Sequence, residues 1–267
     1  MAKIEDQRIL VWCNQPGNLY QTITEAAYLA VKLEKELCLF VNYVDENQRI
    51  QLDECISVMS LQIIKEVQNI EVSKLIIKGS LHGLISELGE KYNAILLCFS
   101  SNMTYKILKA FYKSSFPFYF SKGNLNKTPS FRNVIIPVDF RSSTKDAVLW
   151  GSYLGRFTNS EPVLLKANDK NDQEQKRKVE NTIESAQKLY NQFNFKYTIE
   201  EAKVGSWRIH GEARALSATA DLLIFAGSLN VTWLDYINGP FERRVINQNL
   251  SPVLLINPQK EMYLICS

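Results

Sequence analysis

The two halves of this 267-residue chain repeat one another, segment by segment and in the same order. The matching segments are 8–14 with 133–139, 77–80 with 203–206, and 93–101 with 220–228. The offsets between them are 125, 126 and 127 residues, so the spacing hardly drifts. A repeat of this length is too long for one unit of a solenoid and matches a whole domain. We therefore predict two domains, 1–123 and 129–267, joined by a polar, turn-prone linker.

Composition places the chain among ordinary globular proteins. Hydrophobic residues make up 46% of the sequence and charged residues 22%, as in soluble proteins. No segment approaches the uninterrupted apolar run that crosses a bilayer, and the polar start at 1–7 differs from a secretory signal. The net charge of +3 is too small to indicate nucleic-acid binding by itself. We expect a cytoplasmic protein with neither a nucleic-acid nor a membrane partner.

The five cysteines are scattered, odd in number and without CxxC spacing. Most lie in apolar runs, where a free thiol behaves as a small hydrophobic side chain. The two histidines do not complete a set of ligands, so we expect neither disulfides nor a metal site.

Short, continuous apolar runs alternate along the chain with stretches of helical spacing. Strands without strict two-residue alternation are typical of parallel sheets covered by helices on both faces. Each half is therefore predicted to be a doubly wound α/β domain with a parallel sheet. The predicted strands are 9–13, 37–43, 74–77, 95–99 and 118–120 in the first half, and 134–138, 163–166, 197–204, 222–225 and 253–256 in the second.

Two helix starts can be read from capping patterns. Thr22 followed by Glu25 matches a capping box, and Ser143 with Asp146 offers a similar start in the second half. The segment 169–184 mixes charges of both signs, which is typical of a solvated helix face.

In an open α/β sheet, ligands bind beyond the carboxyl ends of the strands. In the second half these positions are the loops that follow Val138, Lys166, Val204 and Phe225. Any functional site of that half is expected there.

The second half resembles the universal stress protein family, and the whole chain resembles the members of that family with two tandem domains. The resemblance rests on 134–139, 204–205, 220–228 and 251–256, which span the second half. It implies an adenine-nucleotide-alpha-hydrolase-like fold for each half.

The resemblance also implies how the halves meet. In the family, the last strand of each domain pairs with the last strand of its partner. Phe118–Phe120 would then lie against Val253–Ile256, forming an intrachain pseudo-dimer, and a homodimer of the chain stays open. The resemblance names no protein partner.

Family members that bind ATP carry spaced glycines after the fourth strand and a Gly-Ser or Gly-Thr at the next helix start. Backbone amides there cradle phosphate oxygens because no Cβ blocks the approach. The second half keeps Gly227, but Asn230 stands at the second glycine position and Gly239 comes one place early. Pro240 then removes an amide donor, although proline is also ordinary at a helix start.

If the second half binds a nucleotide, the ligand implied is ATP or AMP with Mg. The resemblance places Asp139 near the adenine and Gly227, Ser228, Asn230 and Arg243 near the phosphates. The full predicted site is Val138, Asp139, Gly205, Gly227, Ser228, Asn230, Gly239 and Arg243.

The first half departs further from the ATP-binding pattern. Asn14 replaces the aspartate, and the loop after Phe99 contains no glycine. The segment 101–117 is eight residues shorter than its counterpart 228–252. We expect no phosphate cradle in this half.

Two functions remain open on these grounds. The first is a non-enzymatic stress-response or regulatory protein with weak or absent ATP binding. The alternative is a module that binds ATP or AMP through the second half only. His82 and His210 both follow Gly-Ser turns, but no acid partner stands in a recognisable motif, so we expect no catalytic residue.

Overall fold

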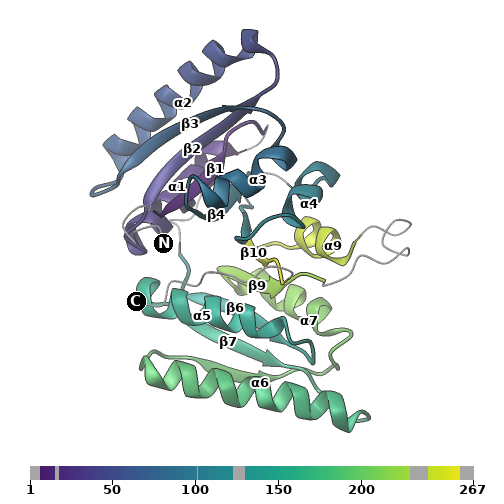
Figure 1. Cartoon of the computed structure of the whole chain (residues 1–267). Coiled ribbons are helices and arrows are strands. Elements are labelled where there is room, and N and C mark those ends of the chain that lie inside the picture. The colour runs from purple at the N-terminus through teal and green to yellow at the C-terminus, as the bar shows by residue number, and fades with distance from the viewer. Residues whose placement is uncertain (1–6, 16–17, 101, 123–129, 229–239, 259–267) are drawn as a thin grey trace. The chain divides into compact units, whose positions relative to one another are not determined.

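The computed structural model describes residues 7–15, 18–100, 102–122, 130–228 and 240–258. These residues form two compact units, which divide between residues 129 and 130. Within the described residues, each unit contains five parallel strands in the same relative order (Figure 1). The doubly wound α/β fold predicted for each half is confirmed.

The first unit has the strand order β3-β2-β1-β4-β5. Its strands are β1 Arg8–Trp12, β2 Glu36–Tyr43, β3 Val72–Lys78, β4 Ala94–Phe99 and β5 Phe118–Phe120. Its helices are α1 Leu19–Lys32, α2 Glu46–Glu66, α3 Leu81–Glu90 and α4 Tyr105–Phe111. Helix α1 packs with α2, and α3 packs with α4. Right-handed crossovers to either side of β1 place these two pairs on opposite faces of the sheet.

The second unit repeats this arrangement with the order β10-β9-β6-β7-β8. Its strands are β6 Asn133–Val138, β7 Glu161–Lys166, β8 Thr198–Glu201, β9 Leu222–Ala226 and β10 Val253–Ile256. Its helices are α5 Thr144–Thr158, α6 Gln173–Gln192, α7 Ile209–Leu216 and α9 Phe241–Gln248, with a short 3₁₀ helix, η2, at Ser217–Thr219. Helix α5 packs with α6, and α7 packs with α9.

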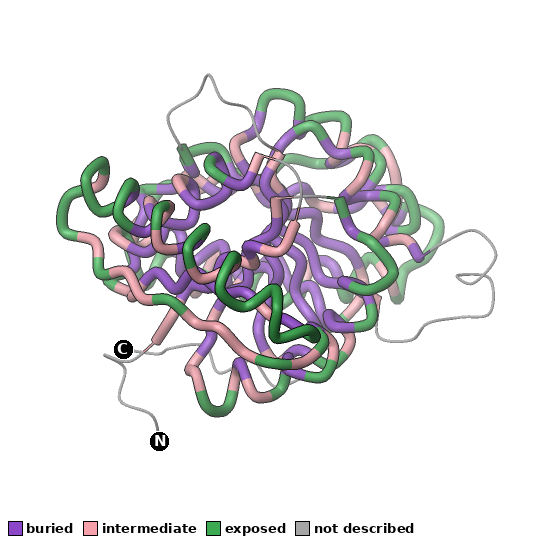
Figure 2. Tube along the Cα trace, turned by 90° about the horizontal axis from the view of Figure 1, so that it is seen from above, coloured by how far each residue is buried: buried purple, intermediate pink, exposed green. Residues whose placement is uncertain are grey.

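Buried strands form the core of each unit. All residues of β9 and β10 are buried, as are the three central residues of β1. Figure 2 shows buried segments in purple and exposed segments, in green, mainly on helices and loops. Burial on both faces explains why these strands read as continuous apolar runs. The strand β8 is fully exposed and carries Glu200 and Glu201, as charged edge strands often do.

The ten predicted strands are all present, but two were predicted with clearly wrong lengths. The run 74–77 is part of the longer β3, Val72–Lys78. The run 197–204 was predicted as one strand, whereas β8 covers only Thr198–Glu201. Beyond it, the backbone N–H of Ala202 still bonds to the oxygen of Lys166 before the chain turns toward α7.

The capping box predicted at Thr22 and Glu25 is wrong. Helix α1 begins at Leu19, with Asn18 at the N-cap position. Thr22 and Glu25 therefore lie inside the helix, where both are buried. The Thr22 hydroxyl donates to the oxygen of Asn18 (3.3 Å), and Glu25 accepts a 2.7 Å hydrogen bond from the Tyr119 hydroxyl. Thr22 and Glu25 thus make hydrogen bonds inside the first unit and do not cap the start of α1.

The other helix predictions agree better with the structure. Helix α5 begins at Thr144, next to Ser143, although the Ser143 hydroxyl makes no capping hydrogen bond. Helix α6 lies in the charged segment and is capped by Asp172, whose side chain accepts from the Gln175 N–H. Its buried stripe contains Val179 and Tyr190.

The four described cysteines, Cys13, Cys38, Cys55 and Cys98, are free thiols. Burial raises the pKa of Cys38 to about 11, so this thiol is protonated at neutral pH. Among the described residues, none of the helices is both long and apolar enough to span a membrane.

Candidate functional site

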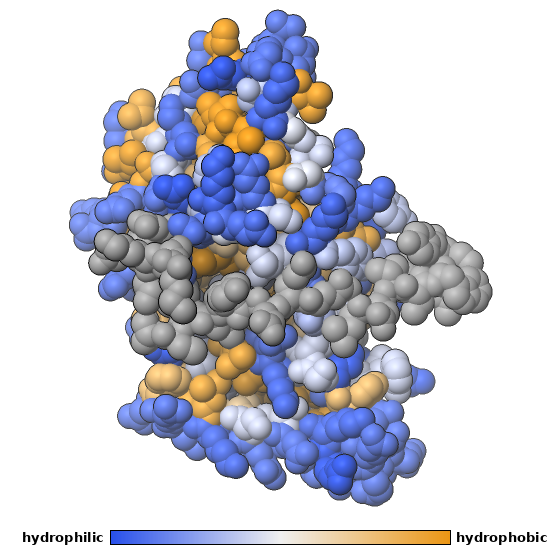
Figure 3. All heavy atoms as spheres, viewed as in Figure 1, coloured by the Kyte–Doolittle hydropathy of each residue, from blue (hydrophilic) through white to orange (hydrophobic). Residues whose placement is uncertain are grey.

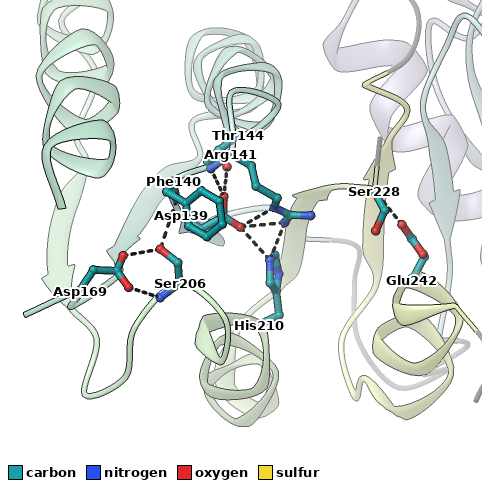
Figure 4. Close-up of polar contacts among 9 residues, drawn as sticks. All are labelled: Asp139, Phe140, Arg141, Thr144, Asp169, Ser206, His210, Ser228 and Glu242. Atoms are coloured by element: carbon teal, nitrogen blue, oxygen red, sulfur yellow. Dashed lines mark hydrogen bonds and ion pairs between the residues drawn. The ribbon is translucent and has the colours of Figure 1, made fainter. Parts of the chain in front are cut away.

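Polar side chains gather where the strands of the second unit end (Figure 4). Asp139 directly follows β6, and Ser228 lies two residues beyond β9. His210 stands in the first turn of α7 and Glu242 in the first turn of α9. The carboxyl edge of the sheet therefore holds the candidate site, as expected for this fold.

Asp139 is buried and fully engaged by its own chain. Its Oδ1 accepts hydrogen bonds from the Arg141 backbone N–H (2.9 Å) and the Thr144 hydroxyl (2.7 Å). Its Oδ2 accepts from Arg141 Nε (2.8 Å) and lies 3.1 Å from His210 Nε2. A carboxylate offers about four acceptor positions, and here all four face a partner.

These contacts keep Asp139 ionised. Burial raises the pKa of a carboxyl group, but the His210 contact and the Arg141 charge outweigh burial here. Together they hold the pKa of Asp139 well below its usual range. The buried charge is balanced by a guanidinium that stays protonated at all accessible pH.

His210 Nε2 faces both members of the Asp139–Arg141 ion pair. Arg141 Nη2 lies 2.7 Å from this nitrogen, and Asp139 Oδ2 lies 3.1 Å from it. Nδ1 is buried and has no hydrogen-bond partner among the described residues. The ring also packs edge-on against Phe225 and Phe241, with centroids 5.6 and 4.6 Å away.

The pKa of His210 is lowered, mainly by burial and further by the Arg141 charge, against opposing effects of Asp139 and Glu242. The folded protein thus favours neutral His210, while the unfolded chain protonates near pH 6.5. The contribution of this group to stability is complete above pH 6.5 and falls as the pH drops from there toward the folded-state pKa.

Over that window we expect the free energy of unfolding to fall by up to about 1.4 kcal/mol per pH unit. Urea unfolding between pH 8 and pH 5 measures this slope. His210→Phe should flatten it, and an unchanged slope would contradict the assignment.

A second cluster ties the loop after β7 to the loop before α7. The Ser206 N–H donates to Asp169 Oδ1 (2.8 Å), and the Ser206 hydroxyl donates to Asp169 Oδ2. The Ser206 oxygen in turn accepts from the Phe140 N–H (3.2 Å). A Cβ at Gly205 would lie 2.6 Å from Asp169 Oδ1. Glycine is therefore required at 205 by this packing alone, with or without a ligand.

The backbone amide of Ser228 donates a hydrogen bond to Oε1 of Glu242. Glu242 is only 1% exposed, and its Oε2 is buried with no hydrogen-bond partner among the described residues. The first turn of a helix favours negative charge because its amides are unpaired. The backbone amide that follows Gly227 is thus already hydrogen-bonded to a carboxylate of the same chain.

The structure also places the other predicted site residues. Val138 is buried at the end of β6, and Gly227 is buried with its N–H bonded to the Ile256 oxygen (2.9 Å). Arg243 is partly buried on α9. Asn230 and Gly239 lie outside the described residues.

The residues that sequence reasoning missed are the partners of the predicted ones. The structure brings Arg141 and His210 to Asp139, Asp169 to Gly205, and Glu242 to Ser228. Each missed residue follows a strand end or opens a helix, so the strand-end rule could have nominated them. Nothing in the sequence shows which of them touch.

The corresponding edge of the first unit is held by neutral amides. Asn14 Nδ2 donates to the Asn42 oxygen (2.6 Å), and the Asn42 N–H donates to Asn14 Oδ1 (2.8 Å). Asn42 Nδ2 then reaches the Gly79 oxygen (2.7 Å). Amide pairs join the strand ends here, where the second unit uses a charged cluster.

Comparison with solved structures identifies the fold, while the sequence itself matches no family model and no curated protein. A universal stress protein from Archaeoglobus fulgidus DSM 4304 aligns with a TM-score of 0.65 and 13% identity, over 96% of this chain and 100% of that one. A functionally unknown protein from Pseudomonas aeruginosa PAO1 aligns with a TM-score of 0.60 and 14% identity, over 95% and 93%. The cytoplasmic domain of a prokaryotic cation chloride cotransporter aligns with a TM-score of 0.54 and 16% identity, over 96% and 97%. The chain therefore has the fold of the universal stress proteins along nearly its whole length.

Proposed function

We propose that this chain is a cytoplasmic stress-response or regulatory protein of the universal stress protein family, with no catalytic activity and weak or absent ATP binding. One observation carries the proposal: the two groups that a nucleotide would need are already held by the chain's own side chains. These groups are the carboxylate of Asp139 and the backbone amide of Ser228.

At the adenine end, the nucleotide would have to compete with an ion pair. Both oxygens of Asp139 are occupied by Arg141, Thr144 and His210. An adenine amino group would replace a hydrogen bond between two charged groups with one whose donor is neutral, and so would lose the attraction between the opposite charges. The exchange would also leave the partly buried guanidinium of Arg141 without its counter-charge.

At the phosphate end, the chain supplies an anion of its own. Glu242 accepts from the amide of Ser228, where a phosphate oxygen would otherwise bind. A phosphate would have to displace this buried carboxylate, and like charges in a low-dielectric site repel. Pro240, immediately before α9, offers no backbone N–H.

We further propose that the two units are diverged repeats of one domain, 1–123 and 129–267, paired within the chain through their last strands. The shared strand order of the two units supports this assignment. Strands β5 and β10 each end the strand order of their own unit and consist of apolar or aromatic residues. An unpaired strand edge of this composition is a hazard in a soluble protein.

We expect Mg-ATP to leave the thermal unfolding of the full chain unchanged, because a ligand stabilises the folded state only when it binds. At 100 times its Kd a ligand adds about 2.7 kcal/mol, which is easily seen as a rise in Tm. Differential scanning calorimetry with millimolar Mg-ATP or Mg-AMP measures the effect, and mass spectrometry of freshly purified, denatured protein detects any carried nucleotide.

A rise of several degrees, or a co-purified nucleotide, would overturn the proposal in favour of a nucleotide-binding second half. Two adjacent arginines on α9 then provide a matched pair. Arg243→Ala would reduce the rise, whereas Arg244→Ala, at an exposed position, would not.

A further inference from the structure

Helix α2 of the first unit has two apolar faces, whereas a surface helix ordinarily has one. Its inner face packs on the sheet through Ile56 and Ile63, which are fully buried. Four large apolar side chains lie elsewhere on the helix and are between 47% and 70% exposed. They are Ile50, Val58, Leu61 and Ile64, here termed the outer stripe.

The outer stripe lies on one side of the helix, with Glu54 and Ser57 between Ile50 and the other three members. At 3.6 residues per turn, its four members fall within an arc of about 120°. The centre of this arc lies about 140° around the helix from Ile56 and about 160° from Ile63. Figure 3 shows orange side chains at the surface of the part of the unit that α2 and β3 form. This face is therefore turned to solvent and apolar.

The second unit provides an internal control, because α6 stands at the same place in the repeated fold. Every exposed residue of α6 is polar or charged, and its apolar residues are buried or partly buried. Two helices in equivalent positions thus differ in their outer surface. The position in the fold does not require an apolar outer face, so the stripe on α2 is a property of this helix.

Side-chain contacts fix the rotation of α2 about its axis. Lys74 on β3 pairs with Asp53 (3.1 Å) and donates to the Ser57 hydroxyl (2.7 Å). Near the end of the helix, the Tyr20 hydroxyl donates to Glu66. The outer stripe is therefore held facing outward and cannot turn into the core.

We propose that the outer stripe is the contact surface for a second copy of this chain, packed as an antiparallel pair of α2 helices. A two-fold axis between Val58 and Leu61 places Val58 against Leu61 of the partner subunit, and the reverse. Such an interface is isologous, so each contact occurs twice. Val58, Leu61 and Ile64 lie within the overlap of the two helices and are buried there, whereas Ile50 lies beyond it because position 69 is past the end of α2.

Charge complementarity selects a second copy as the occupant. Glu54 and Lys65 lie in the same arc as the stripe, at equal distances along the helix from the proposed axis. The antiparallel arrangement therefore sets Glu54 of each copy against Lys65 of the partner subunit. Both side chains are exposed, and neither has an ion-pair or hydrogen-bond partner recorded within the described part of the chain. A parallel pair would instead set like charges side by side.

The size of the surface sets the expected affinity. One helix from each copy, in contact over about four turns, buries less area than the roughly 1,200 Å² typical of stable complexes. We therefore expect a reversible dimer with a Kd in the micromolar range.

Sedimentation velocity of the full chain over a micromolar concentration series tests the proposal. The wild type should shift from monomer to dimer, and Leu61→Glu should raise the dimer Kd by about tenfold or more. Glu54→Lys should also weaken the dimer, and adding Lys65→Glu to that variant should restore it, because the swap recreates both pairs. Restoration by the double variant cannot come from general loss of hydrophobicity or of folding.

The matched control is Leu250→Glu, which places the same charge at another exposed leucine, outside the stripe. It should leave the Kd unchanged. A wild type that stays monomeric throughout the series overturns the proposal. So does a dimer that Leu61→Glu leaves intact, or a double charge swap that fails to restore binding. None of these results depends on whether a nucleotide binds the second unit.

Discussion

Replacing Asp139 with alanine should lower the free energy of unfolding by about 3–5 kcal/mol, the usual result of breaking a buried ion pair from one side. Asp139 is 2% exposed and neutralises Arg141 while bonding Thr144. Without it, a guanidinium stays partly buried beside His210 with no counter-charge. Urea unfolding of the purified variant at pH 7.5 measures the loss.

The double variant Asp139→Ala/Arg141→Ala separates the charge effect from simple loss of packing. Once the aspartate is gone, removing the uncompensated guanidinium should cost little or restore stability, so the two effects should not add. Equal and additive losses, or a single variant within about 1 kcal/mol of wild type, would show that the cluster is not a coupled ion pair.

Gly151→Ala should destabilise the second unit by about 1–3 kcal/mol, although alanine is the better helix former. A Cβ at this position of α5 would lie 2.3 Å from Ile136 Cδ1 and 2.5 Å from the Tyr190 hydroxyl. Both neighbours are buried, and the Tyr190 hydroxyl is fixed by a 2.9 Å hydrogen bond to the Val148 oxygen. The added methyl group must displace one of them. Thermal and urea unfolding measure the change.

Gly211→Ala is the matched control, since Gly211 is also a helical glycine of the second unit. A Cβ there meets nothing within 4 Å, so the gain in helix propensity should stabilise the protein by about 0.5–1 kcal/mol. If both variants change stability in the same direction, close packing at Gly151 is not the cause.

The sheets could be predicted from the sequence because parallel strands covered on both faces leave unbroken apolar runs. Runs such as that ending at Val138 are distinct from their flanks, and the repetition supplied a second reading of each. The starts of the helices were harder to predict from the sequence. Thr22 and Glu25 carry the spacing of a cap, yet the chain buries them and uses Glu25 to bind Tyr119, 94 residues away. A local pattern cannot reveal a partner so distant in sequence.

The same limit applied to the candidate site. The edge of the sheet and Asp139 followed from strand ends and from the family resemblance. That His210 would contact Asp139, 71 residues earlier, depended on how α7 packs beside β6. Glu242 read as an ordinary acidic residue in a first helical turn, and only folding brings it to the amide of Ser228.

The cluster around Asp139 has a consequence for how this protein can diverge. Arg141 and His210 are compatible with their buried positions only while the aspartate balances the one and orders the other. Replacing any one of the three residues removes a partner of the other two and so lowers the stability of the fold. We therefore expect selection against single replacements and tolerance of a joint replacement. The amide pair Asn14–Asn42 in the first unit carries no charge and escapes this coupling. The three positions should therefore be inherited as a block, present together or lost together, while the equivalent positions of the first unit drift one at a time.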